Sequence, residues 1–331
     1  MGWIFLFLEF HALVNPLKPA TTIEDHINRL TSRGMQVDSS EATQWLSNVS
    51  YYRLSAYWYP AREVNTEADQ PSDNFTSGTS FDQVVRLYEA DRKLRTLIHD
   101  GIERIEIAMR TQTTELLCLK SPADPAGYLG SDLFREKFDH TSWLTKIFGR
   151  LARAKKNESV NHYSKKYSGR FPLWVVAESM DFSDISRLYS GLRGADQQQV
   201  AENLNLKIDF STLTSEQQNK IQKRHPLASW LEQLTIVRNT CAHHGRLWNK
   251  SFAPASASAL RTNGNLNLLH EEQSGRIFGA LVMMSHLLRA VSPGTTWPDK
   301  VLKIIVDDFL QNSIVEPSSL GIPDNWCQTK I

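Results

Sequence analysis

The fold class is decided by residues 81–117, which read FDQVVRLYEADRKLRTLIHDGIERIEIAMRTQTTELL. Five apolar residues in this stretch recur at spacings of four, four, three and four: Leu94, Ile98, Ile102, Ile105 and Met109. This spacing is the period of an amphipathic α-helix that buries one face. Ser80 and Gln83 supply a capping box at the start of the helix, and Pro122 ends it. The stretch therefore predicts one long helix.

Helical periodicity also dominates the rest of the chain, and alternating strand patterns are scarce. Capping residues and apolar spacing predict further helices at about 22–34, 39–49, 173–192, 226–244, 270–291 and 298–312. The first has a capping box in Thr22 or Thr21 with an acidic residue three positions later. Gly245 is placed to end the helix at 226–244. We therefore expect an all-α fold.

The predicted helices divide the chain into five segments. An apolar extension at 1–17 precedes an N-terminal helical module at 18–62. Residues 63–80 contain many turn-forming residues and few apolar ones, so they predict a mobile loop. The main helical domain follows at 81–292, and a last helix with a tail occupies 293–331.

The cysteines and the N-terminal segment bear on the cellular compartment. Cys118, Cys241 and Cys327 lie far apart and lack the spacing of zinc ligands, which favours a reduced protein without a structural metal. Residues 1–16 have no basic start before their apolar run, and they are too short to span a bilayer. Two interpretations of this segment stay open: translation assigned from too early a start codon, or a segment that packs on the rest of the protein. We expect a cytoplasmic protein that uses no membrane, metal or other cofactor.

Charge is distributed unevenly along the chain. The whole chain has 37 Lys and Arg against 36 Asp and Glu, but the window at 135–170 has ten basic and three acidic residues. Such a local excess attracts a polyanion such as RNA, although a basic run is also typical of a solvated helix face. The candidate RNA-binding residues of this window are Arg150, Arg153, Lys155, Lys156, Lys165, Lys166 and Arg170.

The candidate catalytic residues lie in LTIVRNTCAHHGRLWNK, residues 234–250. Arg238, Asn239 and His243 fall at the predicted end of a helix there. An imidazole that titrates near neutrality can move protons to and from ribose oxygens, and a guanidinium can bind the phosphate charge. His244 and Arg246 follow as candidate supporting residues. The alternative is that Arg238 and His243 cap the last carbonyls of the helix.

Three further residues are weaker candidates for the site. Glu106 and Arg110 are four apart on the long helix, so they form either an intrahelical ion pair or a support for Arg238 and His243. Arg53 lies among five aromatic residues at 51–59, which either stack on RNA bases or pack in the core.

Several blocks of the sequence, taken together, resemble the Abi-like family of bacterial abortive-infection proteins, of the AbiD and AbiF type. They follow one another in the family's order between residues 18 and 254. The blocks are KPATTIEDHINRLTSRG (18–34), NVSYYRLSAYWYP (48–60), TSFDQVVRLYEADRKLRTLIHDGIERIEIAMRT (79–111), HYSKKY (162–167), PLWVVAESMDFSDISRLYSGL (172–192) and VRNTCAHHGRLWNK (237–250).

The resemblance implies a fold and an activity. The Abi-like family is similar to the HEPN superfamily of helical bundles, which also occur in type VI CRISPR effectors. It implies a HEPN-like bundle with an N-terminal helical accessory segment and C-terminal helices. Ribonucleases of that superfamily have an Arg, a polar residue and a later His, which Arg238, Asn239 and His243 match.

The resemblance further implies a homodimer in which two such sets form one metal-independent RNA-cleaving site. An antitoxin or a phage component is then an expected partner. Two alternatives stay open: a sensor that binds a structured noncoding RNA without cleaving it, and a purely structural interaction protein.

Overall fold

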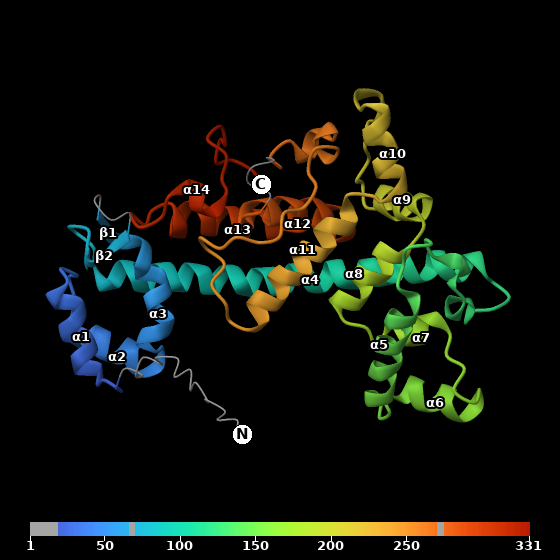
Figure 1. Cartoon of the computed structure of the whole chain (residues 1–331), viewed down its shortest axis with the longest axis horizontal. Coiled ribbons are helices and arrows are strands. Elements are labelled where there is room, and N and C mark those ends of the chain that lie inside the picture. Colours follow the sequence, from blue (N-terminus) through green and yellow to red (C-terminus); the bar gives the residue numbers. More distant parts are fainter. Residues whose placement is uncertain (1–18, 66–69, 270–274) are drawn as a thin grey trace, which may run out of the picture. The chain divides into compact units, whose positions relative to one another are not determined.

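The computed structural model describes residues 19–65, 70–269 and 275–331 (Figure 1). The predicted extension at 1–17 lies outside the described residues. The described part is helical apart from one two-stranded sheet and isolated bridges, so the all-α prediction is confirmed. The chain divides into two compact units, of which the first ends at Val84 and the second is Val85–Ile331.

The first unit contains three short helices and a β-hairpin. The elements are α1 (Ile23–Ser32), α2 (Ser39–Asn48), α3 (Tyr51–Trp58), β1 (Arg62–Asn65) and β2 (Gln70–Phe75). The Thr22 side chain accepts from the Asp25 backbone N–H, and the Asp25 side chain accepts from that of Thr22, so the predicted capping box is confirmed. Leu30, Leu54 and Trp58 are fully buried and form the centre of this small core.

The prediction of a mobile loop at 63–80 is wrong for residues 63–65 and 70–75, which form strands. β1 and β2 pair antiparallel, and the first unit includes them. Asp73 forms ion pairs with Arg33 at 2.7 Å and Arg62 at 3.6 Å, and the Phe75 N–H donates to the Arg33 carbonyl at 2.8 Å. Because Arg33 lies 40 residues before Asp73 in the sequence, local composition does not reveal the hairpin.

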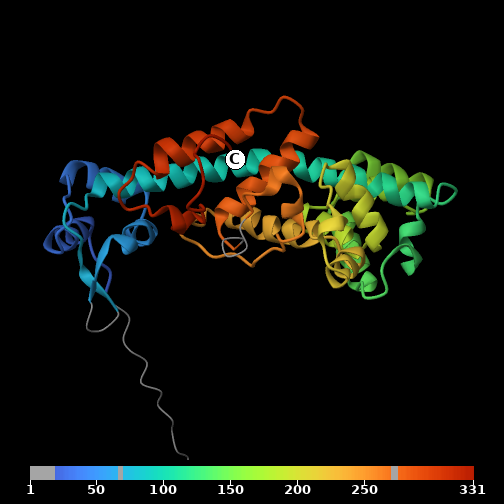
Figure 2. The same ribbon diagram turned by 90° about the horizontal axis from the view of Figure 1, so that it is seen from above.

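The long helix α4 (Phe81–Lys120) organises the second unit. Its predicted capping box is present, since the Ser80 N–H donates to Gln83 Oε1 at 2.9 Å. Figures 1 and 2 show α12 and α13 lying along α4, and Figure 1 shows α11 crossing it obliquely. Trp297 Nε1 donates to the Leu97 carbonyl at 2.6 Å, and Lys93 pairs with Asp308 at 3.0 Å. Residues 293–331 therefore pack with the main domain of the chain.

The other helices of the second unit are α5 (His140–Arg153), α6 (Glu158–Lys166), α7 (Leu173–Ala177), α8 (Phe182–Gly191), α9 (Gly194–Asn203), α10 (Ser215–Lys223), α11 (Leu227–Ala242), α12 (Ile277–Val291), α13 (Trp297–Lys303) and α14 (Pro317–Leu320). A π-helix at Ile304–Phe309 continues α13. The prediction of one helix at 173–192 is wrong, because the Asp181 side chain starts a new helix there by capping the backbone N–H of Asp184.

Two glycines give opposite predictions for stability. A Cβ on Gly194 would lie 1.7 Å from the Gln222 carbonyl oxygen, whereas a Cβ on Gly149 in α5 would meet nothing within 4 Å. We expect Gly194→Ala to lower the free energy of unfolding by about 3 kcal/mol. Gly149→Ala should raise it by about 0.5–1 kcal/mol, because alanine favours the helix. Urea unfolding followed by circular dichroism measures both, and a Gly194→Ala chain as stable as the parent would contradict the close backbone approach.

Candidate functional site

Helix α11 presents an exposed polar stripe that leads to its C-terminal end. The helix is held by a buried face that includes Trp230, Leu234 and Val237, which are all fully buried. On the other side Ile236, Asn239 and His243 are exposed at spacings of three and four, so they share one face. Two of the three predicted catalytic residues therefore lie together on the solvent side.

The long side chain of Arg238 extends to the same end of the helix. This side chain is half-buried, and Nη1 donates to Asn239 Oδ1 at 3.1 Å. The exposed His243 is the C-cap, and its backbone N–H donates to the Asn239 carbonyl at 3.0 Å. The structure thus brings Arg238 to Asn239 and places His243 one turn further on.

The turn after α11 differs from the prediction that Gly245 ends the helix. The helix ends at Ala242, and His244 rather than Gly245 has the left-handed backbone, with φ of 55°. The Gly245 N–H donates to the Thr240 carbonyl at 2.7 Å, and a Cβ on Gly245 would lie 2.8 Å from Thr240 Cγ2. Glycine is needed here for close approach to the last helical turn, not for a positive φ.

A buried ion pair on α4 holds this turn in place. Asp91 is fully buried, Arg95 is 5% exposed, and the Arg95 guanidinium pairs with the Asp91 carboxylate. Asp91 Oδ1 also accepts from the backbone N–H groups of Leu247 at 3.1 Å and Trp248 at 2.9 Å. Arg95 donates to the Gly245 carbonyl at 3.4 Å. Residues 245–248 are therefore fixed to α4 through their backbone.

Sequence reasoning missed Asp91 and Arg95, although the sequence contains a signal for them. Both share the apolar face of α4 with Leu94 and Ile98, because the spacings are three and four. Two opposite charges four residues apart on a buried face indicate a paired interior site.

Arg110 and Glu106 pair as predicted, since Arg110 Nη2 donates to Glu106 Oε1 at 2.7 Å. Arg110 also donates to the Met180 carbonyl at 3.0 Å. Burial raises the pKa of Glu106, while the charges of Arg110 and Arg238 act to lower it. Glu106 therefore lies within electrostatic range of Arg238, and its role in orienting Arg238 stays a prediction.

The remaining candidates near α11 lie in the turn that Asp91 holds. His244 is exposed directly after His243, and the guanidinium carbon of Arg246 lies 5.7 Å from the ring centroid of Trp248. Trp248 is buried, so Arg246 is positioned by stacking on a fixed ring.

The basic window separates into paired and exposed residues. Arg150 pairs with Asp181 and Asp184, and Arg170 pairs with Asp124 at 2.9 Å. Five exposed basic residues cluster at the end of α5, in the connection after it and on α6: Arg153, Lys155, Lys156, Lys165 and Lys166. Next to them Tyr163 and Tyr167 stack with ring centroids 4.9 Å apart. The excess positive charge is therefore smaller than the residue count indicates.

Arg53 lies in the first unit, where it is exposed on α3. Tyr57 and Trp58 are buried, and the Tyr51 ring stacks on His26 with centroids 4.1 Å apart. Part of this aromatic cluster is thus core. Tyr52 and Tyr59 are open to solvent instead, with exposed fractions of 88% and 51%.

A family model described as Abi-like protein matches residues 44–249, well over half of the chain. The chain belongs to the Abi-like protein family. The match contains α4, the basic window and all of α11, and it starts after the block at 18–34. Comparisons with curated proteins and with solved structures give no match.

The described residues of this Abi-like protein contain neither a membrane-spanning helix nor a cluster of metal ligands. None of the helices described is long and apolar enough to cross a membrane. In the same part of the chain, no group of three or more His, Cys, Asp and Glu residues is arranged to hold a metal ion.

The buried pair predicts that two aspartates of the second unit contribute very differently to the free energy of unfolding. Asp91→Ala leaves the buried Arg95 charge without its partner and two backbone N–H groups without their acceptor, so we expect a loss of about 3–5 kcal/mol in the free energy of unfolding. The control Asp308→Ala removes the more exposed pair with Lys93 and should cost under about 1 kcal/mol.

Denaturant unfolding measures both losses. Hydrogen exchange at the Leu247 and Trp248 amides should also accelerate in Asp91→Ala more than in Asp308→Ala. Equal losses in the two variants would show that the buried carboxylate does not hold the turn.

Proposed function

We propose that this Abi-like protein is a cytosolic anti-phage endoribonuclease of the HEPN type, which cleaves RNA without a metal ion. One observation carries the proposal: Arg238, Asn239 and His243 gather at the exposed end of a helix whose following turn is fixed by a buried ion pair. Fixed donors and an exposed imidazole are what RNA cleavage by the ribose itself requires.

The chemistry assigns a role to each residue. The 2′-hydroxyl gives its proton to a base and forms a bond to phosphorus, while the bond from phosphorus to the 5′ oxygen breaks and that oxygen takes up a proton. His243 moves these protons, and Arg238 binds the charge on the phosphate. Asn239 orients Arg238 through the hydrogen bond between their side chains. The products are a 2′,3′-cyclic phosphate and a 5′-hydroxyl.

An exposed isoleucine supports a second copy of the chain as the partner. Ile236 is 38% exposed and lies on the same face of α11 as Asn239 and His243. Homodimer interfaces are more apolar than the rest of a protein surface, so we place this side chain in the contact between the two copies. In a dimer formed through this face, the two sets of site residues would lie against the same RNA strand.

The exposed basic residues of α5 and α6 support RNA contact. Lysines and arginines provide salt-dependent attraction to phosphates, and the stacked pair of Tyr163 and Tyr167 offers a ring for an unpaired base. The same surface also favours the second candidate function, binding of a structured noncoding RNA without cleavage. Cleavage products distinguish the two functions.

The catalytic assignment predicts that Arg238→Ala and His243→Ala each reduce RNA cleavage by about 100-fold or more, because each removes a proton-transfer or charge-stabilising group. The assay is RNA fragmentation in phage-infected cells at equal expression, with the fragment ends analysed for 2′,3′-cyclic phosphate. His99→Ala, which changes an exposed histidine on α4, is the matched control and should cleave like the parent.

Equal fragmentation in the parent and in His243→Ala would refute the catalytic assignment. Salt-sensitive RNA binding by the parent without any fragments would favour the non-catalytic function.

The dimer predicts a separate effect of Ile236→Glu. A charge in the apolar contact should shift the chain to a monomer and reduce cleavage at least about tenfold, while the fold stays intact because the side chain is exposed. Sedimentation analysis measures the mass. Leu119→Glu, at an exposed apolar position at the end of α4, is the control. A monomeric parent, or a dimeric and fully active Ile236→Glu chain, would rule out this interface.

A further inference from the structure

The second unit contains a polar pocket that shares no residue with the α11 site. Its volume is about 690 Å³, within the usual range for small-molecule sites. Its walls come from residues 205–209 after α9, residues 262–268, the end of α12 and residues 330–331. Except for residues 205–209, these walls lie outside the span that matches the Abi-like family.

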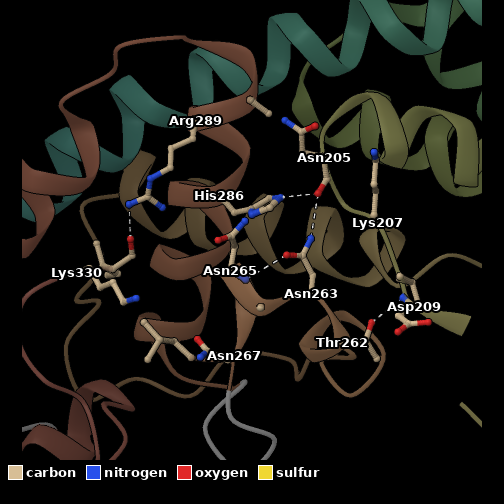
Figure 3. Close-up of a pocket in the computed structure, with 15 residues that line it drawn as sticks. Asn205, Lys207, Asp209, Thr262, Asn263, Asn265, Asn267, His286, Arg289 and Lys330 are labelled. Carbon is tan, nitrogen blue, oxygen red and sulfur yellow. Dashed lines mark hydrogen bonds between the residues drawn. The ribbon is translucent and has the colours of Figure 1, made fainter. Parts of the chain in front are cut away.

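Hydrogen bonds fix the polar groups of the pocket before any ligand binds. The Asn205 carbonyl accepts from His286 Nε2 at 3.2 Å and from Asn263 Nδ2 at 3.1 Å. Asn263 Oδ1 in turn accepts from the backbone N–H of Asn265 at 3.1 Å. Figure 3 shows the His286 ring and the Asn263 amide meeting at the Asn205 carbonyl. His286 is 7% exposed, so a buried polar side chain forms part of the wall.

The charges that line the pocket favour an anion. The pocket is lined by three basic side chains, Lys207, Arg289 and Lys330, and by one acidic side chain, Asp209. Arg289 donates to the backbone oxygen of Ile331 at 2.6 Å, which holds the guanidinium in place. Asp209 Oδ1 accepts from both the backbone N–H and the hydroxyl of Ser211, so this carboxylate oxygen is already hydrogen-bonded within the turn that follows it.

The uncharged groups of the pocket suit a ligand with hydrogen-bonding edges. Asn265 and Asn267 each have an amide that can donate and accept. Burial lowers the pKa of His286, which favours the neutral form of the ring. With Nε2 donating to Asn205, the other ring nitrogen is an acceptor. Ile208 and Leu268 add apolar surface.

We propose that this pocket binds a nucleotide, with the phosphate on Lys207, Arg289 and Lys330 and the base against the asparagine amides. The size of the cavity leaves room for a base and a ribose in addition to a phosphate. The site is independent of the proposed ribonuclease activity.

The test is isothermal titration calorimetry on the full chain with AMP, GMP, CMP and UMP, and with ribose 5-phosphate and inorganic phosphate as comparisons. At least one nucleoside monophosphate should bind at least about tenfold more tightly than either comparison. Lys207→Ala combined with Lys330→Ala, and separately Asn265→Ala, should each weaken that binding about tenfold or more. Asn265 and Lys207 are exposed, so these variants should fold. Lys303→Ala, at an exposed lysine outside the pocket, is the control and should bind normally.

Three outcomes would overturn the assignment. One is the absence of binding by all four nucleotides to the folded parent chain. Another is an affinity for ribose 5-phosphate equal to that for the nucleotides, because the asparagine amides would then not recognise a base. The third is unchanged nucleotide affinity in both pocket variants, which would place the binding elsewhere on the molecule.

Discussion

The Asp91 carboxylate is fully buried, and it accepts hydrogen bonds from Arg95 and from the backbone of two residues that lie far along the chain. Removing a carboxylate from water is costly unless its charge and lone pairs are satisfied. Arg95 supplies the opposite charge, and the Leu247 and Trp248 N–H groups supply directional donors. The turn that follows α11 can therefore adopt few conformations, although it lies outside any helix. The positions of Arg246 and Trp248 depend on this arrangement.

The sequence predicts those parts of the fold that depend on local spacing. The apolar period from Leu94 to Met109 identifies α4, and the capping boxes at Thr22 and Ser80 identify the starts of α1 and α4. Apolar spacing in the sequence also identifies α11 and the residues at its end. The hairpin escapes prediction because Arg33 and Arg62 stabilise it through Asp73, and such pairing leaves no local pattern.

Charge is the property that sequence reasoning describes least well here. Arg150 belongs to a strongly basic window, yet its guanidinium is balanced by Asp181, which lies 31 residues away, and by Asp184. Asp91 looks like one more acidic residue of an amphipathic helix, yet it is buried and paired. Counting charges in a window measures neither burial nor pairing across the fold. The three candidate catalytic residues are easier to find because they lie within six positions of one another.

The hydrogen bond from Leu247 to Asp91 closes a loop of 156 residues. During synthesis, the acceptor leaves the ribosome long before its donors exist, and contacts of such long range form late in folding. Until then, the turn after α11 lacks the bonds from the Leu247 and Trp248 N–H groups to Asp91. A nascent or truncated chain therefore lacks the geometry of the completed helix end.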